Sequence, residues 1–304
     1  MLRSRLAPTP SGYLHLGNAF SFLLTWLVVR KQHGHLHLRI DDLDADRAKP
    51  DYYDDIFTTL DWLGLDYDSG ARSTDDCLRN WSQKRRLNEY HQALMRLADA
   101  GEIFACECSR SLLATIASNG VYPGECRTKG LPLTQSNTAW RVRLVEGASD
   151  VQFYDAVQGK MRMDAARAQG DVIVRRRDGI PAYHIASLVD DTLDEITLVV
   201  RGADLLPSTA VQIALAQKLG LAGFPTATFL HHALITEDSG KKLSKSHDSL
   251  SLRAMRENGT SAEEVIARCA ALMGLHIPHP SLQALLEVFP LEGIQRITTG
   301  INSV

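Results

Sequence analysis

Residues 8–18 read Pro8-Thr9-Pro10-Ser11-Gly12-Tyr13-Leu14-His15-Leu16-Gly17-Asn18, a run of turn-forming residues between two apolar segments. Leu2 and Leu6 before the run predict a short strand, and the apolar spacing over residues 19–27 after it predicts a helix. The junction is therefore a helix N-terminus. Free backbone N–H groups and the positive end of the helix dipole meet there, so the sequence predicts a site that can hold a phosphate.

The side chains at this junction suit a nucleotide. His15 and Asn18 add hydrogen-bond donors, and Gly17, which has no Cβ, lets a flat purine lie close to the backbone. A second segment, Lys241-Lys242-Leu243-Ser244-Lys245-Ser246, brings a cation, Lys245, that can neutralise charge building up on a phosphate. Alone, the first segment reads as an ordinary turn and the second as a solvated loop. In this order the two predict an ATP site.

The chain alternates between strand and helix patterns on either side of a central segment. In chain order, we expect a strand at 36–40, helices at 50–63 and 82–100, a strand and a helix within 198–219, a strand at 229–235, and helices at 261–273 and 280–288. Residues 101–179 are instead rich in Cys, Gly, Pro and polar turns. This pattern indicates an α/β protein with an inserted subdomain.

The central segment holds three of the chain's five cysteines within 21 residues: Cys106, Cys108 and Cys126. A Cys-x-Cys pair with a third thiol suits tetrahedral zinc better than it suits a disulfide. The spacing leaves the fourth donor open among Glu107, Glu125 and Tyr122. With four protein donors the zinc would be structural, and it would stabilise a small lobe that lacks a core of its own.

Composition favours a soluble enzyme of about two domains. The chain has 304 residues, of which 44% are hydrophobic, and a formal net charge of −3. No apolar run approaches the roughly 20 residues that cross a membrane, and the N-terminus lacks the pattern of a secretion signal, so we expect a cytoplasmic protein with no membrane partner. The net charge argues against a protein that coats nucleic acid indiscriminately.

The two motifs resemble the HIGH and KMSKS signatures of class I aminoacyl-tRNA synthetases, here His15-Leu16-Gly17-Asn18 and Lys242-Leu243-Ser244-Lys245-Ser246. Residues 5–12, 39–44 and 199–204 are similar to the glutamyl branch of that class, and the resemblance covers most of residues 3–250. It implies a Rossmann-type catalytic domain on a parallel sheet, with ATP and Mg²⁺ as cofactors and with His15 and Lys245 as catalytic residues. The ATP-binding residues that it implies are Pro8, Gly12, His15, Gly17, Asn18, Lys242, Ser244 and Lys245.

The same resemblance implies a pocket for L-glutamate, lined by Arg5, Ala7, Thr9, Asp41, Tyr183 and Arg201. Two arginines on one pocket suit a substrate with a side-chain carboxylate, which a planar guanidinium can hold with two parallel hydrogen bonds. One position departs from the family, because its Arg-Ile-Glu-Asp is here Arg39-Ile40-Asp41-Asp42. The carboxylate that is expected to hold the substrate α-amino group is therefore one methylene shorter. Leu205 and Ser187 replace a tryptophan and an asparagine of full-length glutamyl enzymes.

Only 58 residues follow Ser246, which we expect to be too few for the helical anticodon-binding region of full-length glutamyl enzymes. In this respect the chain is similar to the short glutamyl-queuosine tRNA(Asp) synthetase family, which attaches glutamate to a base rather than to a tRNA terminus. That resemblance implies tRNA(Asp) with queuosine as the partner. It also implies a Zn²⁺ site formed by Cys106, Cys108, Tyr122 and Cys126. Basic residues at 175–177 and 241–256 flank the expected active site, and we expect them to contact tRNA.

These observations predict a monomer with four regions. The catalytic domain has its first half at 1–100 and its second half at 181–237, with a zinc-binding, tRNA-contacting insertion at 101–180. Residues 238–304 hold the lysine loop and a short helical region, without an anticodon-binding domain. Three alternatives stay open: a truncated glutamyl-tRNA synthetase that charges a tRNA terminus, an amino-acid ligase with a non-tRNA acceptor, and a non-catalytic, zinc-containing tRNA-binding module.

Overall fold

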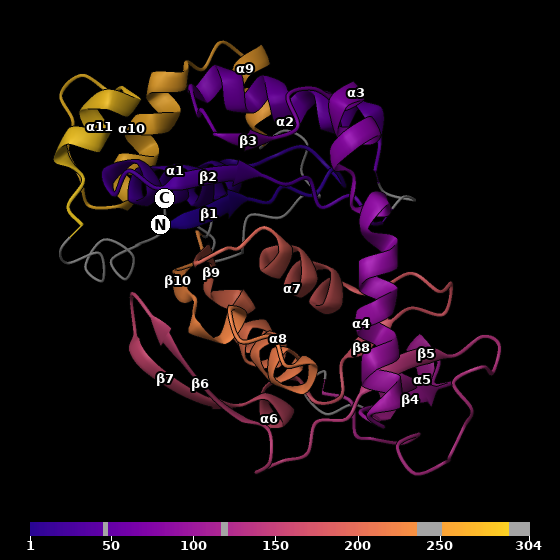
Figure 1. Cartoon of the computed structure of the whole chain (residues 1–304). Coiled ribbons are helices and arrows are strands. Elements are labelled where there is room, and N and C mark those ends of the chain that lie inside the picture. Colours follow the sequence, from indigo (N-terminus) through magenta and orange to yellow (C-terminus); the bar gives the residue numbers. More distant parts are fainter. Residues whose placement is uncertain (45–47, 117–120, 236–250, 292–304) are drawn as a thin grey trace.

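The structure, a computed structural model of the chain, describes residues 1–44, 48–116, 121–235 and 251–291 (Figure 1). Its N-terminal half contains a parallel sheet in the order β1 (Arg3–Leu6), β2 (His35–Leu38) and β3 (Ser69–Gly70). Two helices connect these strands, α1 (Leu16–Lys31) and α2 (Pro50–Leu63). Parallel neighbours require such crossovers, so the predicted alternation of strand and helix is confirmed.

The second half of the chain continues the same layer. β9 (Leu198–Gly202) and β10 (Thr228–His232) are parallel, and α8 (Leu206–Leu219) connects them. β9 lies beside β1, because the Thr197 N–H donates to the Arg3 carbonyl at 2.9 Å and the Ser4 hydroxyl donates to the Leu198 carbonyl at 2.8 Å. Residues 3 and 4 thus lie beside residues 197 and 198 in the same order, so β1 and β9 are parallel. Their carboxyl ends therefore meet at one edge of the sheet.

The segment between the halves has a small sheet of its own and a hairpin that joins the main sheet (Figure 1). The small antiparallel sheet has the order β4 (Ile103–Cys106), β5 (Ala139–Val142) and β8 (Ile173–Arg175). The hairpin consists of β6 (Asp150–Asp155) and β7 (Gly159–Asp164), and β6 pairs in parallel with β10. Two short helices, α5 (Arg110–Ile116) and α6 (Ala165–Gln169), complete the segment, and α7 (Tyr183–Leu193) follows it. The hairpin thus extends the main sheet by two strands.

The C-terminal helices pack on the N-terminal half (Figure 1). They are α9 (Leu252–Glu257), α10 (Ala262–Leu272) and α11 (Leu282–Val288), and the last two match the helices predicted at 261–273 and 280–288 to within two residues at each end. α10 begins at a capping box, in which Ser261 Oγ accepts from the Glu264 N–H and Glu264 Oε2 accepts from the Ser261 N–H. Because α10 and α11 cover the side of α1 that the sheet leaves open, α1 is buried around most of its circumference.

Several predicted helices and strands were wrong at one end. The helix expected at 82–100 begins as a 3-10 turn, η2 (Gln83–Arg86), and only α4 (Leu87–Asp99) is α-helical. Gln83 explains the irregular start, because its N–H donates to Asp42 and its side-chain amide to Asp190, both at 2.8 Å. Strands β2 and β10 end sooner than expected, where the chain turns into the loops at the carboxyl edge of the sheet. The remaining short elements are α3 (Thr74–Asp76), the π-turn η1 (Cys77–Trp81), η3 (Ala203–Leu205) and η4 (Phe224–Thr226).

Two apolar clusters form the core. One lies between the N-terminal sheet and helices α1, α2 and α10, and the other lies between β9, β10 and helices α4, α7 and α8. Within the described part of the chain, no helix is long and apolar enough to cross a membrane.

Gly70 allows a test of how closely β3 approaches β2 in the N-terminal sheet. Its φ is 108°, and a Cβ at this position would lie 2.1 Å from the Leu38 carbonyl oxygen on β2. Gly101 also has a positive φ, 70°, but has open space around it. We expect Gly101→Ala to cost about 1–2 kcal/mol of unfolding free energy, the ordinary cost of a left-handed alanine, and Gly70→Ala to cost clearly more because a strand must move. Urea unfolding measures both, and equal losses would contradict this close approach.

Candidate functional site

A cavity of about 410 Å³ lies at the carboxyl ends of the parallel strands, the usual place for a ligand in such sheets. Its lining includes all of the residues that the sequence predicts for glutamate: Arg5, Ala7, Thr9, Asp41, Tyr183 and Arg201. Arg5 lies on β1, Asp41 follows β2, and Arg201 lies on β9. Tyr183 is the first residue of α7. The fold therefore brings residues from distant parts of the sequence to one cavity, which we call the amino-acid cavity.

One wall of the amino-acid cavity is a buried chain of alternating charges. Asp191, on α7, accepts hydrogen bonds from Arg5 Nε at 3.0 Å and from Arg39 Nη1 at 2.5 Å. Arg39 also donates to Asp41 through Nε at 2.6 Å and through Nη2 at 3.3 Å. Burial disfavours the Asp191 carboxylate, but Arg5 and Arg39 outweigh burial and hold its pKa below the ordinary value. Arg5 is thus fixed through Nε, and its Nη groups make no hydrogen bond with the described residues.

Arg201 is a third buried cation of the amino-acid cavity, after Arg5 and Arg39. Its Nη2 donates to Thr209 at 2.5 Å and to Gln212 at 2.9 Å, and its Nη1 reaches the Tyr183 hydroxyl at 3.4 Å. Burial lowers the pKa of Arg201. The structure shows no ion pair between Arg201 and a described carboxylate. A buried guanidinium held by neutral groups is a favourable partner for an anionic ligand.

His231 and Asp155 support Arg201 from behind. Asp155 Oδ2 lies 2.6 Å from His231 Nδ1, and both side chains are fully buried. We assign the proton to Nδ1, so that Nε2 can accept from Thr209 at 2.8 Å or from Arg201 Nε at 3.4 Å. Sequence reasoning missed both residues. Asp155 lies on β6 in the insertion, and only the pairing of β6 with β10 brings it to His231.

A second cavity, of about 180 Å³, adjoins the first and shares Asn18, Ser21 and Gly202 with it. The predicted ATP-binding residues His15, Gly17 and Asn18 all line it. His15 is the N-cap of α1, and its N–H donates to Asn18 Oδ1 at 3.0 Å. A Cβ on residue 17 would lie 2.9 Å from the His15 ring. Glycine therefore leaves room for the histidine ring as well as for a ligand.

The other predicted ATP-binding residues are less directly placed. Pro8 and Gly12 lie in the loop between β1 and α1 and are not among the residues that line the two cavities. The Pro8 carbonyl instead accepts a hydrogen bond from the Asp41 N–H at 2.9 Å, which joins the two loops. Lys242, Ser244 and Lys245 lie outside the described residues.

The described residues on either side of the lysine segment both lie near His15. Ile235 lines the same cavity as His15, and Ser251 forms an isolated β-bridge with His15. The Leu252 N–H also donates to the Leu14 carbonyl at 2.7 Å. The chain thus leaves this cavity before the lysine segment and returns to it afterwards.

The insertion brings its sulfur atoms together. Cys106, Cys108 and Cys126 place their Sγ atoms within 4.8 Å of one another, and all three residues are buried. The Tyr122 hydroxyl lies 3.5 Å from Cys106 Sγ and 3.7 Å from Cys108 Sγ, and it accepts a hydrogen bond from the Cys126 N–H at 2.8 Å. Zn–S bonds of about 2.3 Å in a tetrahedron separate sulfurs by roughly 3.8 Å. The donor set and its spacing therefore fit a zinc ion.

Glu107 and Glu125, the other two candidates for a fourth donor, are placed differently. Both carboxylates pair with Lys129, at 3.2 Å and 3.9 Å, and both side chains are about half exposed. Among the three candidates, Tyr122 is thus the one whose oxygen lies at the sulfur cluster.

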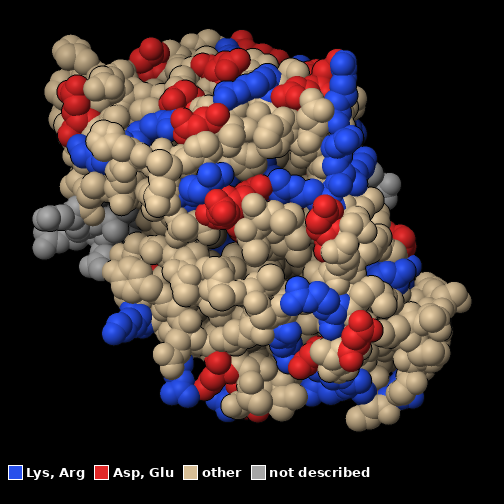
Figure 2. All heavy atoms as spheres, in the orientation of Figure 1, with Lys and Arg blue, Asp and Glu red and all other residues tan. Residues whose placement is uncertain are grey.

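The basic triplet at 175–177 is largely engaged within the protein, and residues 241–250 of the other basic segment lie outside the described residues. In the triplet 175–177, Arg176 pairs with Asp44 at 3.1 Å, and Arg177 donates to the Cys108 carbonyl at 2.8 Å. Figure 2 shows Lys and Arg mixed with Asp and Glu over most of one face, with basic atoms gathered over α3 and the start of α4. Arg177 therefore stabilises the cysteine loop.

The two other positions noted in the sequence lie at the site. Leu205 lines the amino-acid cavity, and Ser187 is buried one turn along α7 from Tyr183. The Ser187 hydroxyl has no hydrogen-bond partner among the described residues.

The chain is similar to a known family and to several curated proteins. A family model described as tRNA synthetases class I (E and Q), catalytic domain, matches residues 1–303. Glutamyl-Q tRNA(Asp) synthetase of Nitratidesulfovibrio vulgaris is 38% identical over 288 residues, which are 90% of this chain and 87% of that protein. The protein of the same name from Geobacter sulfurreducens is 40% identical, over 83% of this chain and 78% of its own length.

A solved structure shows the same fold. The glutamate-tRNA synthetase of Elizabethkingia anophelis superimposes with a TM-score of 0.81 at 23% sequence identity, covering 100% of this chain and 68% of that chain. The family match over nearly the whole sequence, together with the identity to curated relatives, shows that the chain belongs to the class I tRNA synthetases of the E and Q group.

Proposed function

We propose that this protein activates L-glutamate with ATP and transfers the glutamyl group to the queuosine base of tRNA(Asp). The observation that carries the activation step is the amino-acid cavity, where two buried arginines, Arg5 and Arg201, stand beside the cavity of His15. The relatives named Glutamyl-Q tRNA(Asp) synthetase support the choice of acceptor.

The cavity suggests one orientation for glutamate. Its side-chain carboxylate binds the Nη groups of Arg5 and the guanidinium of Arg201, which together offer charge and a planar arrangement of donors. Its α-ammonium group lies toward Asp41. Its α-carboxylate lies toward Asn18 and Ser21, which line both cavities, and so points at ATP.

For activation the protein must position glutamate and ATP and stabilise the negative charge that develops. It forms no covalent bond to either substrate. An oxygen of the α-carboxylate attacks the α-phosphorus of ATP, and the bond to pyrophosphate breaks as the new O–P bond forms. His15 and the N–H groups at the start of α1 stabilise the added negative charge. ATP carries Mg²⁺, and Lys245 is predicted to add a further cation. A hydroxyl of the acceptor next attacks the glutamyl carbonyl, loses its proton and releases AMP.

At position 41 the family has a glutamate residue, whose side chain is one methylene longer than that of Asp41. A direct contact with Asp41 therefore requires the substrate to bind closer to the backbone here. The Asp41 carboxylate already accepts two hydrogen bonds from Arg39, which hold it at the end of β2. We infer that the α-ammonium group approaches the strand end more closely, or binds Asp41 through a water molecule.

The cysteine cluster supports a structural zinc site. We propose that Cys106, Cys108, Tyr122 and Cys126 hold Zn²⁺ and that the metal stabilises the insertion at 101–180 between the catalytic halves at 1–100 and 181–237, with 238–304 as the lysine loop and helical region. Burial, reinforced by Cys106, raises the pKa of Tyr122. The phenol therefore keeps its proton at neutral pH unless a metal displaces it.

Removing the charge of Arg201 should weaken glutamate binding selectively. We expect Arg201→Gln to raise KM for glutamate by about 100-fold, since losing one partner of a buried charge pair costs roughly 2–5 kcal/mol, while KM for ATP changes little. ATP/pyrophosphate exchange measures both constants. Arg162→Gln, at a side chain that is 71% exposed, is the matched control and should behave as wild type. An unchanged KM for glutamate would contradict the assigned role.

Replacing Tyr122 by phenylalanine should weaken zinc binding without abolishing adenylation. We expect Tyr122→Phe to lower zinc affinity by at least 10-fold, because changes even around metal ligands cost about 10- to 100-fold, and to make residues 101–130 more sensitive to proteolysis. Competition with a chelator and metal analysis give the affinity. Tyr154→Phe, at an exposed tyrosine, is the control. Loss of pyrophosphate exchange in proportion to zinc would instead indicate a catalytic metal.

The acceptor can be identified directly. We expect wild-type protein to exchange pyrophosphate with glutamate in the absence of tRNA, and to glutamylate tRNA(Asp) only when the tRNA contains queuosine. Labelled glutamate with queuosine-containing and queuosine-free tRNA(Asp), and with tRNA(Glu), separates the possibilities. Charging of tRNA(Glu) would point to a terminal ribose, and exchange with no transfer to any tRNA would point to another acceptor.

A further inference from the structure

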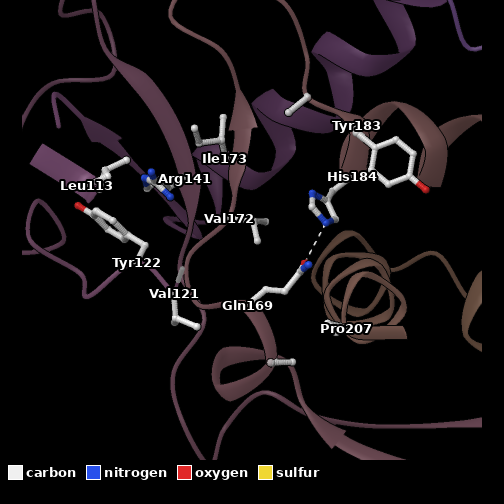
Figure 3. A pocket seen from close by; sticks show the side chains of 12 residues that line it. Leu113, Val121, Tyr122, Arg141, Gln169, Val172, Ile173, Tyr183, His184 and Pro207 are labelled. Atoms are coloured by element: carbon white, nitrogen blue, oxygen red, sulfur yellow. Dashed lines mark hydrogen bonds between the residues drawn. The ribbon is translucent and has the colours of Figure 1, made fainter. Parts of the chain in front are cut away.

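A third cavity lies between the insertion and the start of helices α7 and α8. Its volume is about 520 Å³, larger than the 410 Å³ of the amino-acid cavity. The activation step uses none of its residues except Tyr183, which lines both cavities. We call it the insertion cavity (Figure 3).

One side of the insertion cavity carries a fixed pair of neutral polar groups. Figure 3 shows His184 and Gln169 joined by a hydrogen bond, which measures 3.1 Å between Nε2 and Oε1. The Gln169 amide is held at its other end by Ser208, at 3.2 Å. Burial, with a smaller contribution from Arg201, lowers the pKa of His184 to about 4, so the ring is neutral at neutral pH. Its Nδ1 makes no hydrogen bond to the described residues and can accept one from a ligand.

The opposite side of the insertion cavity is aromatic and cationic. Tyr122 and Arg141 lie there in Figure 3, and the Arg141 guanidinium stands 3.9 Å from the centre of the Tyr122 ring. The rest of the lining is mainly apolar: Leu113, Val121, Ala168, Val172, Ile173, Ala182 and Pro207. None of the described residues that line the cavity is acidic. This combination suits a flat, neutral ring with hydrogen-bonding edges, and it is poorly suited to an inorganic anion or to an aliphatic amine.

The proposed function calls for such a ligand. An enzyme that acts on a base of a folded RNA must take the base out of its stack and hold it in a protein pocket. Single-stranded bases are commonly held between side-chain planes and read by hydrogen bonds to their edges. Tyr183 forms the boundary between the two cavities, so a nucleotide bound in one is adjacent to a glutamyl adenylate in the other.

We propose that the insertion cavity binds one unstacked base of the acceptor RNA and so positions the RNA for glutamyl transfer. This inference rests on the proposed function and adds to it a recognition site formed jointly by the insertion and helices α7 and α8. It gives the insertion a role in acceptor binding in addition to metal binding.

Filling the cavity tests the proposal. Ala168 lines it and is partly exposed on α6, so Ala168→Trp fills space without displacing a core residue. Ala114, on α5, is exposed and does not line the cavity, so Ala114→Trp is the matched control. The two assays are ATP/pyrophosphate exchange with glutamate alone and glutamylation of a queuosine-containing anticodon stem-loop of tRNA(Asp).

We expect Ala168→Trp to lower kcat/KM for the stem-loop by about tenfold or more, which is the loss expected when one base can no longer bind against protein side chains. The rate of ATP/pyrophosphate exchange should not change. Gln169→Ala, which removes the amide without adding bulk, should raise KM for the stem-loop and leave kcat nearly constant. Wild-type transfer by Ala168→Trp, or an equal loss of exchange and transfer, would overturn the inference. A wild-type protein that does not glutamylate the stem-loop would instead refute the proposed function.

Discussion

Asp191 is one carboxylate shared by two arginines, and the wall of the amino-acid cavity depends on that sharing. Arg5 comes from β1 and Arg39 follows β2, so their bonds to Asp191 connect both strands to α7. All three side chains are almost completely buried, and a buried charge is tolerated only when it is paired and hydrogen-bonded. Removing any one of them would leave an uncompensated charge inside the protein. The network thus couples the folding of the sheet to the position of Arg5 in the amino-acid cavity.

The neighbouring acidic residue of α7 extends this coupling to another helix. Asp190 accepts hydrogen bonds from Gln83 at 2.8 Å, from Tyr90 at 2.7 Å and from Arg86 at 2.9 Å. These donors lie on η2 and α4, between the N-terminal half and the insertion. The two adjacent carboxylates of α7 share Arg39, whose Nε lies 3.7 Å from Asp190 Oδ2. Their other partners differ: Asp191 binds Arg5 in the cavity wall, and Asp190 binds the helix that leads to the insertion.

The insertion depends on the catalytic layer for much of its stability. Its own apolar cluster consists of Phe104, Cys106, Cys108, Tyr122 and Cys126, which is too small to fold a lobe alone. Three other contacts compensate: β6 pairs with β10, Arg177 binds the cysteine loop, and the cysteine cluster can hold a metal. In return, the hairpin supplies Asp155 to the buried histidine behind Arg201. The insertion cavity exists because these two parts meet.

Local sequence was sufficient for most of the helices outside the insertion and for the motif at the start of α1. Helix α2 could be predicted because proline at its first turn, apolar spacing and Gly64 at its end are properties of neighbouring residues. Helix α10 has its capping box within four residues. The residues of the amino-acid cavity were named through family resemblance, since no periodicity in the chain distinguishes Arg5 or Arg201 from other arginines.

The sequence by itself thus determined the α/β class, the cysteine grouping, strands β1, β2, β9 and β10, and helices α1, α2, α4, α8, α10 and α11, because these follow from contacts between residues close in the chain. Tertiary structure decided the rest. Arg39 and Asp191 are 152 residues apart and Asp155 and His231 are 76 apart, so only strand pairing and helix packing bring them together. Likewise the spacing of the cysteines left Tyr122 and Glu107 as equal candidates and only family resemblance favoured Tyr122, whereas burial beside the sulfurs distinguishes them. Whether a charged or polar group is exposed or buried against a partner is a property of the packed chain.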